Sequence, residues 1–276
     1  MDINHILLLL ASLNLLGDLY NILRFSKQLP GWILIGNLIA IAGCALAWLL
    51  APADAGLIAI GILAVYFIVI KSYANKRAPM RRLPCPATKL LILANVAVFL
   101  YQLWNGATND PVRFVALGAL YTPLLEQGEW WRLLSAQFMH WGVLHLFCNM
   151  LGLWFLGPLT ESILGPLRYI MAYLLCGAGG MLVAFGASLV ATTPHSIVLL
   201  GASASVLGLV GIQAAFSLKA FRRSGSMVAK AQLASMLQIV VLQGIFDLMV
   251  PEVSSTAHTG GAAVGFVLGS FIFMRR

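Results

Sequence analysis

Two polar side chains in otherwise apolar stretches of the chain have the residue types for nucleophilic catalysis. Ser203 lies in the stretch Gly-Ala-Ser-Ala-Ser, and His258 lies in Ala-His-Thr-Gly-Gly. A serine hydroxyl is a weak nucleophile until a base accepts its proton, and histidine is the side chain whose pKa suits that task near neutrality. The pair predicts acyl-transfer chemistry, with Ser203 as the nucleophile and His258 as the general base.

A second pair of residues has the spacing needed to stabilise negative charge. His145 and Asn149 are four residues apart, so in a helix they share one face. Donors on that face can point together at the charge that develops on a substrate carbonyl. We therefore expect His145 and Asn149 to form an oxyanion site.

The surroundings of His258 predict a two-residue catalytic unit. Gly261 and Gly265 follow it on the same helix face, which permits close approach to the serine helix. Asp247 and Glu252 are expected in the preceding helix end and loop, with no carboxylate evidently placed to orient the histidine. The sequence predicts a Ser-His dyad rather than a triad.

Other interpretations compete with catalysis. Small residues around a serine often serve only to pack membrane helices, and Ser205 is a rival nucleophile, although two residues along a helix turn it roughly 200° away. A transporter would need ionisable residues along a path through the bilayer, and only Asp18 and Asp247 come close. The sequence has no His-Glu-x-x-His motif, which would bind zinc in a metalloprotease. The tripeptide Leu-Gly-Asp that ends at Asp18 is at best half of an aspartyl-type protease motif.

Composition indicates what must position these residues. Of 276 residues, 61% are hydrophobic and only 9% are charged, which is typical of a membrane protein with several spans. The net charge of +8 comes from short basic clusters between apolar runs, which argues for membrane topology rather than for nucleic-acid binding. The four cysteines have no paired spacing, and we interpret them as apolar filler rather than as a disulfide or metal framework.

The apolar runs predict an all-α bundle. Nine are long enough to span a bilayer, at residues 5–24, 31–51, 56–74, 87–105, 143–161, 167–190, 198–219, 230–250 and 256–274. The chain start lacks the basic residues of a signal peptide, so we count the first run as structure, although its polar stripe also suits an interfacial helix. If the runs alternate, every basic residue except Arg113 and Arg132 falls on one side, which we take as cytoplasmic.

A basic, proline-containing linker at 75–86 predicts two modules: an N-terminal extension over 1–80 and a six-helix core over 81–276. The long external loop at 106–142 contains Trp131 and Arg132, and its aromatic and charged residues favour the outer membrane surface. The runs that begin at 143, 198 and 256 would be parallel, which places the four candidate residues at one depth, roughly 5 to 10 Å below that surface.

At these residues the chain resembles the rhomboid family of intramembrane serine proteases. The match covers roughly 87–276 and consists of Trp131-Arg132, His145-x-x-x-Asn149, Gly201-x-Ser203 and Ala-His258-x-x-Gly261-x-x-x-Gly265. The resemblance implies Ser203 as nucleophile, His258 as base, and an oxyanion site of His145, Asn149 and the Ser203 N–H. It also implies cleavage of transmembrane protein substrates near their outer ends, with no cofactor and no metal. Trp131 and Arg132 would belong to the membrane-associated loop.

The chain departs from the family at two positions. Family members usually have glycine directly after the nucleophile, where this chain has Ala204, and an aromatic often packs beneath the histidine from the position of Leu207. The leading hypothesis is an active protease in a bacterial inner (plasma) membrane. The alternative is an inactive rhomboid-like protein that binds client transmembrane helices; the presence of both Ser203 and His258 counts against it.

Overall fold

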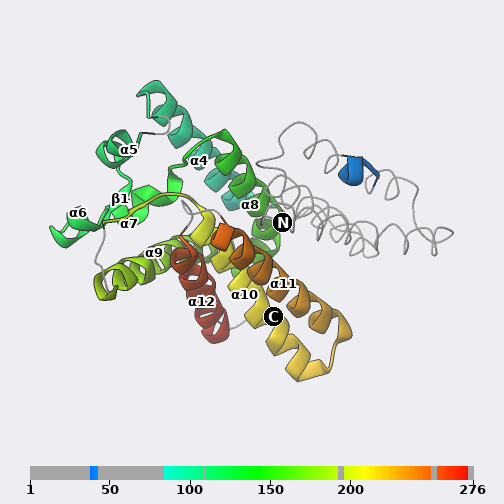
Figure 1. Ribbon diagram of the computed structural model, residues 1–276. Coiled ribbons are helices and arrows are strands. Elements are labelled where there is room, and N and C mark those ends of the chain that lie inside the picture. The colour runs from blue at the N-terminus through cyan, green and yellow to red at the C-terminus, as the bar shows by residue number, and fades with distance from the viewer. Residues whose placement is uncertain (1–37, 43–83, 108–109, 192–195, 250–253, 273–276) are drawn as a thin grey trace. The chain divides into compact units, whose positions relative to one another are not determined.

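The computed structural model describes residues 38–42, 84–107, 110–191, 196–249 and 254–272 (Figure 1). The chain divides into two compact units, residues 1–81 and 82–276. Of the first unit, only helical residues 38–42 are described. The three leading predicted helices, and with them Asp18, therefore lie outside the described residues except for this short segment.

Six long helices form the second unit. They are α4 (Pro86–Trp104), α8 (Val143–Leu164), α9 (Pro166–Val190), α10 (Ser203–Ser224), α11 (Met227–Met249) and α12 (Ser255–Phe271). By length and composition, the first five are suited to cross a membrane, α11 over Met227–Asp247. The predicted class, an all-α membrane bundle, is confirmed, and each of the six trailing apolar runs corresponds to one helix.

Local sequence explains where several helices begin and end. Proline occupies the first turn of α4 and of α9, where its missing N–H costs no helical hydrogen bond. The side chain of Ser254 caps α12 by accepting from the Ala257 N–H. Gly225 ends α10 in the left-handed conformation, with φ of 63°.

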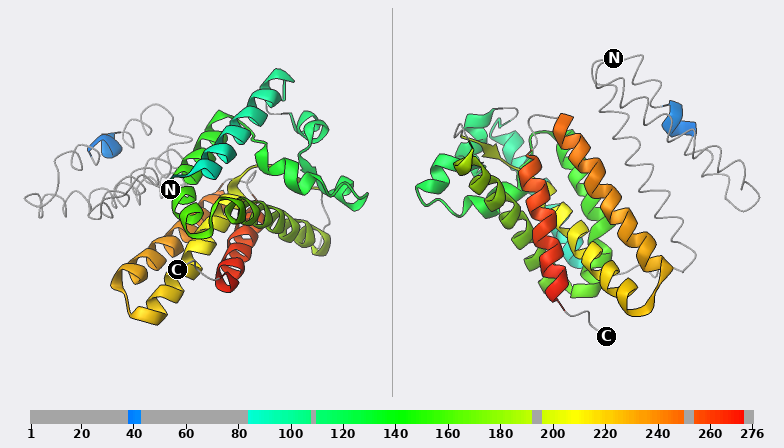
Figure 2. Two further views of the ribbon diagram at one scale, coloured as in Figure 1. Left: turned by 180° about the vertical axis from the view of Figure 1, so that it is seen from behind. Right: turned by 60° about the horizontal axis from the view of Figure 1, so that its bottom comes forward.

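Short elements fill the segment between α4 and α8. They are α5 (Pro111–Leu117), β1 (Leu120–Tyr121), α6 (Thr122–Glu126), α7 (Arg132–Ser135) and the 3-10 helix η3 (Ala136–Phe138). β1 pairs antiparallel with β2 (Val198–Leu199), which directly precedes α10. These elements lie at the end of the unit where α10 begins, away from the turn that joins α10 to α11 (Figure 2).

The pairing of β1 with β2 corrects one expectation about the serine. We predicted a helix from residue 198 with Ser203 about five residues inside it, but α10 begins at Ser203. Val198 and Leu199 are extended because they pair with β1, and Gly201 adopts a φ of 132° that few other residues tolerate. Ser203 is therefore at the helix terminus, next to a turn.

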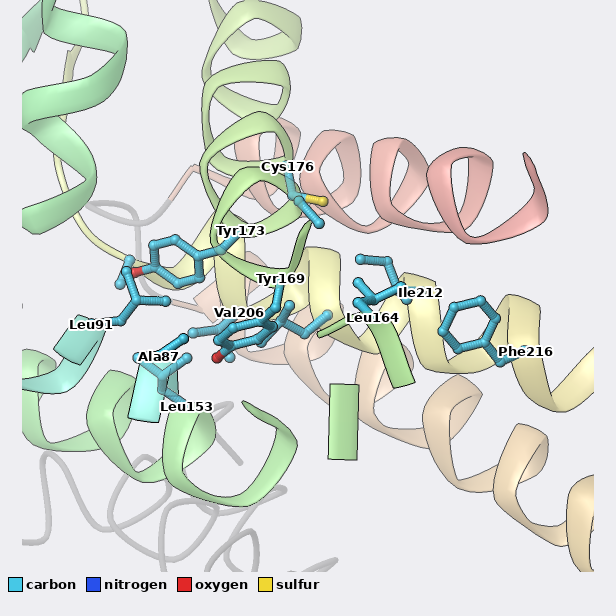
Figure 3. Packing of buried hydrophobic residues seen from close by; sticks show 13 residues of the cluster. Ala87, Leu91, Leu153, Leu164, Tyr169, Tyr173, Cys176, Val206, Ile212 and Phe216 are labelled. Atoms are coloured by element: carbon cyan, nitrogen blue, oxygen red, sulfur yellow. The ribbon is translucent and has the colours of Figure 1, made fainter. Parts of the chain in front are cut away.

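The core lies where α10 meets its neighbours. A cluster of buried side chains joins α4, α8, α9 and α10, and Tyr169 and Tyr173 are completely buried in it (Figure 3). Nearby, the buried carboxylate of Glu161 accepts from the Ala87 and Thr88 N–H groups and from the Thr88 hydroxyl. These bonds satisfy donors that the first turn of α4 would otherwise leave unpaired.

Candidate active site

Ser203 occupies the first position of α10, and the turn before it is shaped by Gly201. The Gly201 N–H donates to the Ala136 carbonyl at 2.9 Å, which ties the turn to η3. A Cβ on Gly201 would lie 2.8 Å from the His145 ring carbon Cε1 and 3.6 Å from Ser203 Oγ. Glycine is therefore required both by the backbone angle and by the ring beside it.

His258 is in the second turn of the capped helix α12, opposite Ser203. Its Nε2 lies 2.6 Å from Ser203 Oγ, which is a short hydrogen-bond distance. The glycine contact expected from the sequence is present: Gly261 packs on the Ala204 backbone and Gly265 packs on the Gly208 backbone. No side chain separates α12 from α10 at these points, and this close approach brings the imidazole to the serine.

A carboxylate lies against the other ring nitrogen, and here the sequence prediction was wrong. Asp247 Oδ2 and Oδ1 lie 2.8 Å and 2.9 Å from His258 Nδ1. We had placed Asp247 in the preceding helix end without a role, and predicted a dyad for that reason. It is indeed in α11, but its side chain points at the histidine, so the geometry is that of a Ser-His-Asp arrangement.

Gln243 was missed by the sequence interpretation, although it left a signal. It precedes Asp247 by four residues and so shares a face of α11 with it. Its Nε2 donates to Asp247 Oδ1 at 2.7 Å. A polar pair at this spacing in an apolar helix indicates a face turned toward protein rather than lipid.

His145 and Asn149 lie on α8, and their side chains make different contacts. His145 is beside Gly201, and its Nδ1 accepts a long bond of 3.4 Å from the Trp141 N–H. This bond assigns the ring proton to Nε2, which leaves a donor for a substrate. The Asn149 amide donates at 2.8 Å to the His145 carbonyl on its own helix, so it buttresses the turn that carries His145.

His140 packs beside His145 and was not singled out from the sequence. The two rings meet edge to face with centroids 5.1 Å apart, and the Gln102 amide bonds both the N–H and the carbonyl of His140. Neither ring nitrogen has a hydrogen-bond partner among the described residues. Burial, together with the neighbouring His145, lowers the pKa of His140 to about 3, so the ring stays neutral and supports His145 by contact.

Ser205, the rival nucleophile, faces away from His258. It is fully buried, and its hydroxyl donates to Gln137 Oε1 at 3.0 Å. The expected rotation of about 200° relative to Ser203 accounts for this direction. Ser205 therefore joins α10 to η3 and lies outside the Ser203–His258 contact.

The two departures from the family pattern have different consequences. The Ala204 methyl is accommodated because it faces a glycine: a Cβ on Gly180 would lie 3.0 Å from Ala204 Cβ. Leu207 lines a narrow cavity between α10, α11 and α12 together with Gln243, Asp247 and His258. In this cavity the imidazole has an aliphatic neighbour at the position where an aromatic ring is common in the family.

Trp131 and Arg132 lie in the segment that precedes η3, away from the serine and the histidine. Arg132 is buried, pairs with Glu129 at 2.7 Å, and donates to the Val115 and Ala119 carbonyls. Its guanidinium carbon lies 4.6 Å from the Trp131 ring centroid, and that ring is half exposed. Arg132 thus fixes the backbone just before Ala136, whose carbonyl accepts the hydrogen bond from the Gly201 N–H.

Comparisons with known proteins point to one protein family. The family model of the Rhomboid domain matches residues 127–275. The chain is 30% identical over 179 residues to "Rhomboid protease GluP" of Bacillus subtilis, a match covering 65% of this chain and 33% of that protein. It is 32% identical over 220 residues to "RHOMBOID-like protein 6, mitochondrial" of Arabidopsis thaliana, covering 68% and 69%. With "Rhomboid protease AarA" of Providencia stuartii it shares 24% over 198 residues, covering 66% and 70%.

Proposed function

This chain belongs to the rhomboid family of intramembrane proteases, and from that premise we propose that it is an active serine endopeptidase. Its substrates would be transmembrane segments of other membrane proteins, cut near their outer ends. The observation that carries the proposal is the 2.6 Å contact between Ser203 Oγ and His258 Nε2 at the start of α10. We place the protein, as part of the same proposal, in a bacterial inner membrane.

The first half of the proposed reaction forms an acyl-enzyme. Ser203 Oγ attacks the substrate carbonyl carbon while His258 Nε2 takes the hydroxyl proton. The oxyanion is met by the Ser203 N–H at the helix terminus and by the Nε2–H of His145. His258 then gives its proton to the leaving amine nitrogen as the peptide bond breaks.

The second half restores the enzyme. Water attacks the acyl carbon, His258 accepts a proton from that water, and the ester bond to Ser203 breaks with return of the proton to Oγ. The open position of Ser203 supports this sequence, because the serine is partly exposed while His258 is buried. A nucleophile must be reachable, whereas its base benefits from a fixed, dry setting.

The alternative function is an inactive rhomboid-like protein that binds client helices. Labelling of the detergent-purified full chain with a fluorophosphonate serine probe, alongside cleavage of a model transmembrane substrate, separates the two. We expect labelling by wild type and by Ser205→Ala, and loss of labelling of at least about 100-fold in Ser203→Ala and His258→Ala. A folded, accessible wild type that neither labels nor cleaves would establish the inactive protein instead.

A further inference from the structure

Asp247 is a buried carboxylate whose only described partners are His258 and Gln243. Its side chain is 1% exposed, and it lies on α11, a helix that carries no other residue of the proposed reaction. A buried charge is costly unless it is paired and hydrogen bonded. Its position is therefore justified by the imidazole, which it contacts through both oxygens.

The contact selects one tautomer of His258. An ionised carboxylate can only accept, so His258 Nδ1 must carry the ring proton that points at Asp247. Nε2 is then unprotonated and faces Ser203 Oγ, which is the form that a general base needs. In the opposite tautomer, Nε2–H would face the serine and could not accept its proton.

Gln243 fixes the direction of the carboxylate. Its Nε2 donates to Asp247 Oδ1, which leaves Oδ2 as the nearer acceptor for the ring at 2.8 Å. The same Nε2 lies 3.4 Å from His258 Nδ1. In this tautomer Gln243 Nε2 and His258 Nδ1 are both donors, so they do not hydrogen bond to each other. Both donate to the Asp247 carboxylate instead.

We propose that Asp247, held by Gln243, is a positioning residue that orients His258 and sets its tautomer. In family members with an aromatic at the position of Leu207, ring packing can restrain the histidine; here a carboxylate from α11 does so through Nδ1. This inference rests on the proposed function, because it describes how the base of that reaction is held. It predicts that a hydrogen bond from a third helix controls the reactivity of Ser203.

The first test compares Asp247→Asn with Asp247→Glu in the full chain. In Asp247→Asn, the asparagine oxygen keeps the hydrogen bond from Gln243. The asparagine N–H group then points at His258 Nδ1, which must accept, so the ring proton moves to Nε2. We expect the rate of fluorophosphonate labelling to fall at least about 100-fold in Asp247→Asn, with partial recovery in Asp247→Glu. Labelling of folded Asp247→Asn at the wild-type rate would overturn the proposal.

Glu161→Gln is the matched control, because Glu161 is also a buried carboxylate but accepts from the start of α4. We expect this variant to unfold at a lower temperature while its folded fraction labels at the wild-type rate. A general sensitivity to the loss of any buried carboxylate would instead slow both variants equally, and that result would also contradict a specific role for Asp247.

The second test does not depend on activity or on a stable Asp247 variant. Nitrogen NMR of wild type with ring-labelled histidine, with the His258 signals identified by their loss in His258→Ala, reports which ring nitrogen carries the proton. We expect Nδ1–H near neutral pH; a neutral His258 protonated on Nε2 would overturn the proposal. If wild type failed to label but showed Nδ1–H, the proposed function would fall while the link between Asp247 and His258 stood.

Discussion

Helices α12 and α11 both pack against α10, and they do so through different atoms. α12 meets α10 backbone to backbone, with Gly261 on Ala204 and Gly265 on Gly208. α11 meets α10 through side chains, where Met236 and its neighbours pack on Leu207 and Val210. In an apolar 18-residue stretch of each helix, 78% of the residues of α10 are buried, against only 11% of those of α11.

This difference separates two requirements of the proposed chemistry. The distance between Ser203 and His258 is fixed by an interface with no side chain to move, since closely packed backbones have few alternative arrangements. The tautomer of His258 depends instead on Asp247, which is carried by a helix with large exposed residues such as Leu237 and Val241. We infer that the rigid interface between α12 and α10 sets the distance between Ser203 and His258. The lightly packed helix α11 sets the orientation of the His258 ring.

The largest expected effect comes from adding one methyl group to the rigid interface. In Gly261→Ala the new Cβ would meet the Ala204 carbonyl oxygen, and neither backbone can move without separating the helices. We expect a loss of about 1–3 kcal/mol in the free energy of unfolding, or more, together with near-complete loss of probe labelling.

Gly244→Ala on α11 is its control, because a Cβ there has nothing within 4 Å. We expect it to fold with at least wild-type stability, since alanine favours a helix more than glycine does. Denaturation in detergent and labelling of the folded fraction measure both effects. Equal losses at the two positions would show that the two interfaces do not differ as described.

A somewhat smaller effect is expected at the turn that leads into α10. Gly201→Ala combines an unfavourable φ of 132° with a clash against the His145 ring. Backbone strain of this kind costs about 1–3 kcal/mol. We expect labelling to fall by at least about tenfold as the strain displaces Ser203 from His258 or His145 from the oxyanion site.

Gly128→Ala separates strain from the clash, because Gly128 has a φ of 96° but nothing within 4 Å of a new Cβ. We expect it to lose stability while the folded fraction labels at the wild-type rate. If both variants labelled equally slowly, strain anywhere in the protein would account for the result and Gly201 would have no particular part in shaping the site.

The same contrast explains what sequence reasoning could reach. The six trailing helices follow from apolar run length, and the Ser203–His258 contact follows from residue types together with the glycines of α12. The start of α10 was misplaced because β2 is two residues long and depends on pairing with β1, which is far away in sequence. Apolar length alone cannot reveal such a pairing.

Asp247 was misjudged for another reason, which concerns helix rotation. The polar residues of α11 are spread around the helix, so hydrophobic periodicity does not say which face meets the bundle. Whether residue 247 points at His258 depends on that rotation and on the connection between α11 and α12. The i, i+4 pair of Gln243 and Asp247 was an indication of the inward face.

The smallest effect should come from Gln243→Leu, which tests how α11, the lightly packed helix, holds the Asp247 carboxylate. Leucine removes the donor to Asp247 Oδ1 but leaves the carboxylate and both helix interfaces in place. A hydrogen bond to a charged group contributes about 1.5–3 kcal/mol, but the carboxylate keeps its bond to the ring, so we expect labelling to slow by only about tenfold.

Asp247→Asn combined with Gln243→Leu should label no more slowly than Asp247→Asn alone, because the glutamine acts through the carboxylate. Additive losses in the double variant would mean that Gln243 reaches His258 directly, through its 3.4 Å contact with Nδ1, rather than through Asp247.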